Sequence, residues 1–171
     1  RLIEDPKAQQ ALWRIREDGA GYAARTLDGG PAWPGFEDSA VPPHNLGRYL
    51  RELRALLADQ GLEGVTYGHY GEGCIHLRVA FGLDKPGGKE RYERFMHAAA
   101  DLVVRHGGSI SGEHGDGLAR SALLERMYSP EMIDLFGRFK ALWDPTGMLN
   151  PGIIIRPPAV TVDLRAVRPL T

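Results

Sequence analysis

The chain has 171 residues, of which 43% are hydrophobic and 25% are charged, and its formal net charge is −1. These values fit one globular domain, and the balanced charge offers no overall field that would attract nucleic acid. The single cysteine, Cys74, excludes an internal disulfide, a four-cysteine zinc site and an iron–sulfur cluster held by this chain alone.

The sequence contains no apolar run near the ~20 residues that span a bilayer, and no signal-peptide pattern near its start. We therefore expect a cytoplasmic protein, and a peripheral position at the inner membrane is left open. The chain begins at Arg1 and enters a helical pattern almost at once. For this reason we expect it to be a piece of a longer protein.

Residues 5–61 are predicted to form two helices that are separated by a loop. Asp5-Pro6 is a typical helix start, and the pattern that follows is predicted to stop at the glycines within residues 19–21. The proline- and glycine-rich loop after it holds at most a short edge strand at residues 39–41. An amphipathic helix is predicted from residue 45 to 60, with Gly61 ending it.

A hairpin is predicted next, because the apolar period changes from 3.6 to 2. Residues 65–69 form its first strand, residues 70–73 its turn and residues 74–81 its second strand. The buried face of the second strand consists of Ile75, Leu77, Val79 and Phe81.

Two further helices follow the hairpin. One covers residues 89–105 and is stopped by Gly107-Gly108, and a short strand is predicted after it at residues 109–112. The last helix has Ser129 at its cap, Pro130 in its first turn and Asp144-Pro145 at its end. Its apolar residues are predicted to face inward: Met132, Leu135, Phe136, Phe139 and Trp143.

This order of elements predicts an α+β fold, in which an antiparallel sheet has helices packed on one face. The other face of the sheet is then free for a ligand.

Two histidines flank the glycine-rich turn of the predicted hairpin. Strand parity places His76 on the face opposite the apolar residues, and the turn lets His69 converge with it. The same alternation places Glu113 on that side, whereas the glycines near His114 leave its direction open. Two imidazoles and one carboxylate match a site with open positions for zinc, Fe(II) or Mn(II). A solvated hairpin beside an ordinary glycine turn is the alternative.

Three segments resemble, in the right order, signatures of a known enzyme family. Residues 68–76 (GHYGEGCIH) resemble the G-H-x-G-D-G-N-x-H segment of the D-lactate and D-2-hydroxyglutarate dehydrogenases, which are flavoproteins of the vanillyl-alcohol-oxidase type. Residues 111–115 (SGEHG) resemble the second signature, and residues 143–152 (WDPTGMLNPG) the terminal one. Residues 12–17 (LWRIRE) are similar to the family's tryptophan-to-arginine segment, so the resemblance extends from about residue 11 to 153.

The resemblance implies roles for individual side chains. His69, His76 and Glu113 would bind a divalent metal (Zn, Mn or Fe), and His114 would be the general base that takes the hydroxyl proton of a 2-hydroxy acid. Arg16 would pair with the substrate carboxylate, although a solvated cation at a helix end is its other interpretation. The resemblance also implies that the loop of Asn150 approaches FAD.

The sequence departs from the family's pattern at positions that concern the substrate. The hydroxyglutarate enzymes use a Lys and a Thr to bind the second carboxylate of their substrate. This sequence has Ala20 and no lysine between residues 22 and 44, which disfavours a dicarboxylate substrate. Arg78 either supplies that second anionic contact or is an ordinary exposed strand arginine. Cys74, in place of the family's Asn, either fills a small buried space or contacts the metal as a thiolate.

We therefore expect residues 1–127 to form the substrate- and metal-binding cap domain of a flavin-dependent 2-hydroxy-acid dehydrogenase of the D-lactate or glycolate type. Residues 128–171 are expected to pack toward an N-terminal FAD domain that this chain lacks, so the chain alone is predicted to be inactive. The residues Trp33-Pro34-Gly35 and Cys74 resemble those of long bacterial members of the family, in which a cysteine-rich iron–sulfur section follows this part of the chain. The alternative function is a non-catalytic metal-binding or interaction module.

Overall fold

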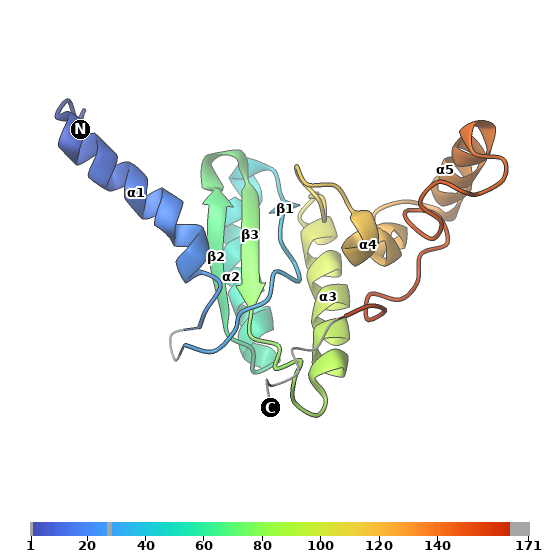
Figure 1. The fold of residues 1–171 in the computed structure, drawn as a ribbon, viewed down its shortest axis with the longest axis horizontal. Coiled ribbons are helices and arrows are strands. Elements are labelled where there is room, and N and C mark those ends of the chain that lie inside the picture. Colours follow the sequence, from blue (N-terminus) through green and yellow to red (C-terminus); the bar gives the residue numbers. More distant parts are fainter. Residues whose placement is uncertain (1, 27–28, 165–171) are drawn as a thin grey trace.

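The computed structural model describes residues 2–26 and 29–164, without the side chains of residues 16, 20 and 22. Figure 1 shows a central sheet with helices behind it and an arm on either side. The strands are β1 (Ser39–Ala40), β2 (Gly64–His69) and β3 (Cys74–Val79), and the α-helices are α1 (Pro6–Tyr22), α2 (Leu46–Asp59), α3 (Gly88–Arg105), α4 (Gly117–Arg120) and α5 (Pro130–Trp143). Short 3-10 turns lie at η1 (Pro43–Asn45), η2 (Tyr70–Glu72) and η3 (Ser121–Arg126).

The sheet is antiparallel with the strand order β1-β3-β2, which confirms both the predicted hairpin and the predicted edge strand. Its register pairs Tyr67 with His76 and His69 with Cys74. The turn closes through Gly73 in a left-handed conformation, with φ of 78°.

The core lies between the sheet and two helices. Figure 1 shows α2 behind β2 and β3, and α3 beside β1. Alternate residues of β3 point into this layer, as the period of 2 predicts, and they share one buried cluster with apolar residues of α2 and α3. Members of the cluster include Leu77, Val79, Phe81, Tyr49, Leu53, Phe95, Met96 and Val103. The predicted α+β architecture with helices on one face is confirmed.

The predicted helix starts are also correct. The Asp5 side chain accepts hydrogen bonds from the first turn of α1, and Ser129 accepts one from Met132 N–H in α5. The predicted stop of α1 within residues 19–21 is wrong, because neither glycine there adopts a positive φ and the helix continues to Tyr22. None of the helices in the described part of the chain is long and apolar enough to cross a bilayer.

The strand predicted at residues 109–112 is wrong. Only an isolated bridge pairs Ser109 with Ala40. Two local hydrogen bonds replace the ladder: the Ser109 hydroxyl accepts from Ser111 N–H at 3.1 Å and donates to Ser111 O at 2.7 Å. Beyond them, Gly112 N–H donates to Asp38 O. The segment is therefore a loop seated on the residues before β1.

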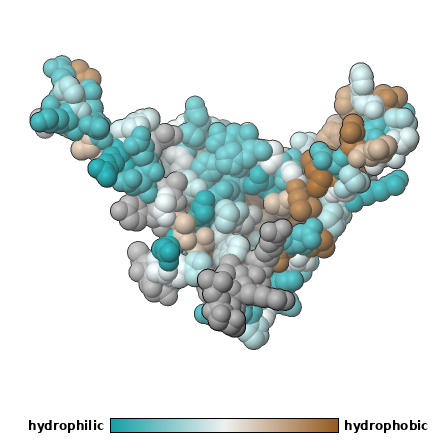
Figure 2. All heavy atoms as spheres, viewed as in Figure 1, coloured by the Kyte–Doolittle hydropathy of each residue, from teal (hydrophilic) through white to brown (hydrophobic). Residues whose placement is uncertain are grey.

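The predicted inward face of α5 is wrong as well for this chain. None of the residues of α5 is buried, and Phe139 and Trp143 are 62% and 75% exposed. The helix lies on the arm to the right of the sheet in Figure 1, away from the core. In Figure 2 hydrophobic surface gathers on that side of the molecule.

Candidate functional site

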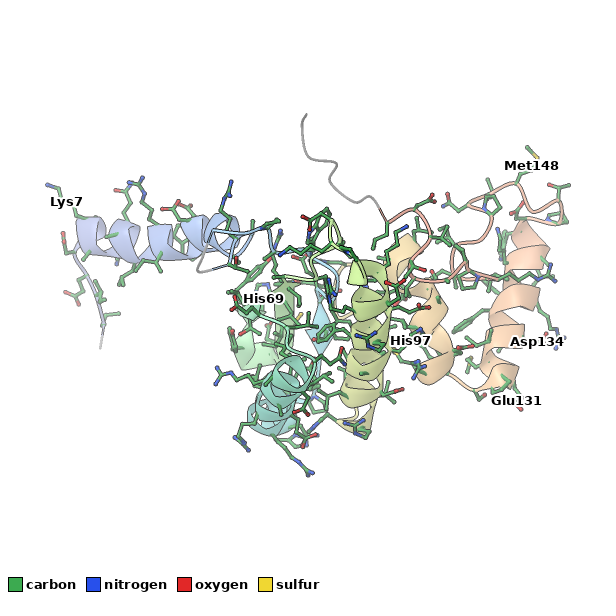
Figure 3. The ribbon with its side chains drawn as sticks, turned by 90° about the horizontal axis from the view of Figure 1, so that it is seen from below. Lys7, His69, His97, Glu131, Asp134 and Met148 are labelled. Carbon is green, nitrogen blue, oxygen red and sulfur yellow. The ribbon has the colours of Figure 1, made fainter. Side chains whose placement is uncertain are left out.

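Both hairpin histidines lie on the face of the sheet opposite α2 and α3, as strand parity predicts for His76 and the glycine-rich turn for His69. His76 is 7% exposed because neighbouring rings cover it. The Tyr67 ring lies 5.0 Å from the His76 ring, and the His69 ring lies 6.1 Å from it in an edge-on arrangement. His69 is near the centre of the molecule in Figure 3, between the arms that carry Lys7 and Met148.

The loop after α3 brings a carboxylate to these imidazoles. Glu113 Oε1 lies 3.3 Å from His76 Nε2 and 3.6 Å from His69 Nε2. His114 turns to the same place: its Nε2 is 3.5 Å from Glu113 Oε1, and its ring stacks on His76 at 5.0 Å and 9°. The structure thus gathers three imidazoles around one carboxylate oxygen.

A divalent cation fits the donor atoms of His76, Glu113 and His114, which lie within 4.8 Å of one another, whereas His69 is not part of that group. The three nitrogen–oxygen distances exceed the 2.7–3.2 Å of an ordinary N–H···O hydrogen bond, so the atoms converge without being bonded to one another. Imidazole and carboxylate are the ligands of zinc and of non-haem iron and manganese sites. The side chains of His69, Glu113 and His114 are between 38% and 47% exposed, which leaves room for a further ligand.

Asp38, which sequence reasoning missed, lies directly beneath the loop. It is fully buried, and one carboxylate oxygen lies within 4.8 Å of the donor atoms of His76, Glu113 and His114. Burial by itself raises the pKa of Asp38, but hydrogen bonds from His114 N–H, the Ser111 hydroxyl and Glu113 N–H bring it below the usual 3.8. The sequence around it, Glu37-Asp38-Ser39, reads as an ordinary polar loop before the edge strand and gave no signal that singled out Asp38.

Arg78 and Cys74 are both occupied by partners within the chain. Arg78 Nε lies 3.0 Å from Glu37 Oε1, which also accepts a hydrogen bond from the Tyr67 hydroxyl at 3.0 Å. The Cys74 thiol donates to Asp38 Oδ1 at 3.4 Å. Burial first, and then the Asp38 carboxylate, raises the pKa of Cys74 to about 12, so the group stays a thiol at neutral pH.

Of the two remaining predicted residues, Asn150 is not brought to this cluster. The side chain of Arg16 lies outside the described residues. Asn150 follows α5 with φ of 42° and lines an apolar cavity of about 400 Å³. In Figure 3 the neighbouring Met148 lies at the far end of the molecule from Lys7, well away from His69.

A larger cavity adjoins the histidines on the β2 side. Its volume is about 490 Å³, and it lies between the C-terminal half of α1 and the hairpin. His69 and His76 form part of its wall, together with Ile15, Glu17, Thr66, Tyr67 and Tyr70. A small molecule in this cavity would therefore touch both imidazoles.

Comparisons with known proteins agree on one family. The family model described as "FAD linked oxidases, C-terminal domain" matches residues 1–154. The chain is 31% identical to a D-2-hydroxyglutarate dehydrogenase of Haemophilus influenzae over 157 residues, which are 92% of this chain and 15% of the relative. It is 38% identical to a D-lactate dehydrogenase of Archaeoglobus fulgidus over 119 residues, 70% of this chain and 26% of the relative. A probable mitochondrial D-lactate dehydrogenase of Danio rerio is 31% identical over 153 residues, 89% of this chain and 30% of the relative. The chain thus spans less than a third of the length of each of these relatives.

Proposed function

Since the chain belongs to the family of FAD-linked oxidase C-terminal domains, we propose that it is the substrate- and metal-binding part of a flavin-dependent 2-hydroxy-acid dehydrogenase. The observation that carries the proposal is the convergence of His69, His76 and His114 on Glu113 Oε1 beside a cavity. The relatives named as D-2-hydroxyglutarate and D-lactate dehydrogenases support the class of reaction.

His69, His76 and Glu113 would hold a divalent metal ion, either zinc, manganese or iron. When bound, such an ion supplies Lewis acidity that makes a substrate hydroxyl more acidic. His114 takes the hydroxyl proton as general base, because its Nε2 lies beside the same carboxylate oxygen. A closed structural metal site is the competing interpretation, and the partial exposure of three of these side chains favours an open, catalytic one.

The substrate we propose is a monocarboxylate such as D-lactate or glycolate. Arg16 would pair with its single carboxylate, as the resemblance of residues 12–17 to the family's tryptophan-to-arginine segment implies. Arg78 is a poor second anion contact, because Glu37 already neutralises it. Glu17 in the cavity wall further disfavours a second negative charge on the substrate.

FAD would be held mainly by a domain outside this chain and would supply the electron acceptor. We propose that residues 1–127 form the cap and that residues 128–171 pack toward that FAD domain, with Asn150 close to the flavin. The exposed apolar side chains of α5 and the apolar cavity at Asn150 support this assignment. An iron–sulfur domain downstream would then carry the electrons away.

The test is dye reduction by the complete protein with D-lactate, glycolate and D-2-hydroxyglutarate, combined with metal analysis. We expect turnover with the monocarboxylates, none from the 171-residue chain alone, and a loss of about 100-fold or more in turnover for His76→Ala and Glu113→Ala. Metal content should fall with turnover while the fold persists.

Two results would contradict the proposal. The dehydrogenase assignment fails if the complete protein oxidises none of the three acids. If removal of the metal unfolds the protein instead of stopping turnover, the site is structural and the module is not catalytic.

A further inference from the structure

Asp38 connects the edge of the sheet to the loop of Glu113 and His114 by both backbone and side chain. Its own N–H donates to Ile75 O, and its carbonyl accepts from Gly112 N–H at 2.7 Å. Glu113 N–H donates to both of its carboxylate oxygens at 2.9 and 3.0 Å, and His114 N–H donates to Oδ2 at 2.7 Å. Successive amides of the loop are thus fixed by one residue.

The carboxylate of Asp38 is too fully engaged to serve as a metal ligand itself, although it lies close to the cluster. Oδ2 accepts from Glu113 N–H, His114 N–H and the Ser111 hydroxyl, and Oδ1 accepts from Glu113 N–H and the Cys74 thiol. These five contacts use the lone pairs that a carboxylate offers. A cation could bind the Asp38 carboxylate only if the loop gave up its hydrogen bonds to that carboxylate.

The backbone of residues 112–114 packs closely against the Asp38 carboxylate. A side chain at position 112 would come within 2.9 Å of Ala40 Cβ and 3.3 Å of Asp38 Oδ1, so the close approach needs glycine. Asp38 itself has φ of 76°, a left-handed conformation that is uncommon outside glycine, although aspartate adopts it more readily than most residues. Such a conformation at a buried residue next to a cluster of candidate ligands points to a functional constraint.

We infer that Asp38 is a positioning residue, which fixes the Glu113–His114 backbone so that both side chains reach His76. This inference rests on the proposed function and adds to it a residue outside the family's three signature segments. The negative charge matters as well as the shape, because a carboxylate accepts from every one of these donors, whereas an amide presents an NH₂ group to some of them.

The experiment compares Asp38→Asn with the parent in the complete protein. We expect affinity for Mn²⁺ and Zn²⁺, measured by titration calorimetry, to fall about 10- to 100-fold, as for other residues that orient metal ligands. Hydrogen exchange of peptides within residues 109–117, measured by mass spectrometry, should become roughly tenfold faster. With D-lactate, kcat should fall more than KM rises.

Leu53→Ala is the matched control, because it opens the core on α2 and lowers Tm while it removes none of the hydrogen bonds of Asp38. It should leave metal affinity and loop exchange within about twofold of the parent. If Asp38→Asn behaves as this control does, the inference is wrong. Complete loss of the metal with an undisturbed loop would also overturn it, since Asp38 would then be a ligand.

Ser111→Ala tests the same idea if Asp38→Asn does not fold. It removes one donor to Asp38 Oδ2 and keeps the charge. Faster loop exchange and weaker metal binding with a small change in Tm support the inference, and unchanged exchange overturns it. A parent protein that binds no metal would defeat the proposed metal site, whereas the exchange measurement would still decide whether Asp38 holds the loop.

Discussion

Gly73 shows how strongly a single residue in the hairpin turn constrains the site. Its φ of 78° lies in the left-handed region, and a Cβ there would stand 2.0 Å from Val41 O. Gly73 O in turn accepts from Val41 N–H at 3.0 Å. The turn that joins His69 to His76 therefore packs directly against the chain that follows β1.

Replacement of Gly73 by alanine should destabilise the fold by about 2 kcal/mol or more, because the backbone strain adds to the clash with Val41. Gly71→Ala in the same turn is the matched control, since a Cβ at Gly71 meets no atom within 4 Å. We expect it to change the free energy of unfolding by less than about 0.5 kcal/mol. Urea unfolding of the two variants provides the comparison, and equal effects would contradict the structural explanation.

Two loops that connect elements of the fold are each held by the carboxylate of an aspartate. Asp144, at the end of α5, accepts from Met148 N–H and Leu149 N–H at 2.9 Å each and from the Lys140 ammonium group. Asp38 holds the Glu113–His114 amides in the same way. In both places an aspartate replaces the regular hydrogen bonds that a helix or strand would supply.

The anchoring by Asp144 predicts a pH dependence. The hydrogen bond from Lys140, followed by that from Leu149 N–H, lowers the pKa of Asp144 below its usual 3.8. The unfolded chain therefore takes up a proton first as the pH falls, so this carboxylate stabilises the fold above pH 3.8 and loses that effect as the pH passes through the folded pKa.

Asp144→Asn should accordingly lower Tm at neutral pH and converge with the parent at the acidic end of the range. Asp134→Asn, on an exposed position of the same helix, is the matched control and should alter Tm little at any pH. Thermal melts across the pH range measure both. A difference between Asp144→Asn and the parent that stays constant down to the most acid pH would argue against the anchoring role.

The sequence allowed prediction of the elements whose signals are local. The alternation from Ile75 to Phe81 and the stop at Gly61 depend on a few neighbouring residues, and both were correct. The strand at residues 109–112 failed because Ser109 and Ser111 satisfy each other's polar groups. Asp38 could not be predicted, since the partners of its side chain lie 36 to 76 positions away.

At the scale of the whole molecule, one layered core carries two projecting helices. Figure 1 shows α1 and α5 leaving the sheet layer on opposite sides. The apolar period predicted an inward face for α5, but the period does not tell what covers that face, and in this chain it is exposed. At the site, strand parity predicted that Glu113 lies beside His76, and the two side chains are in contact. The strand on which that prediction depended is absent among the described residues, where only an isolated bridge forms at Ser109.

The free energy of unfolding of the chain should therefore depend on the core between the sheet and helices α2 and α3, and not on helix α5. Phe95→Ala removes a ring that is 0% exposed and should cost about 3–5 kcal/mol. Phe139→Ala truncates the same residue type on α5, where it is 62% exposed, and should cost less than about 1 kcal/mol. Urea unfolding of the 171-residue chain checks the pair. A large loss for Phe139→Ala would mean that α5 belongs to the core of this chain.

The distance in sequence between the two halves of the site also sets the order in which it can assemble during folding. His69 and His76 share a hairpin and meet once a short turn closes, whereas Glu113, which contacts His76, lies 37 positions beyond it in the sequence. Closing a loop of that length carries an entropic cost that must be met before the contact contributes anything. The carboxylate therefore meets the imidazoles only after this longer loop has closed, and an ion held by both would stabilise the folded state, because the unfolded chain offers no assembled site to bind it.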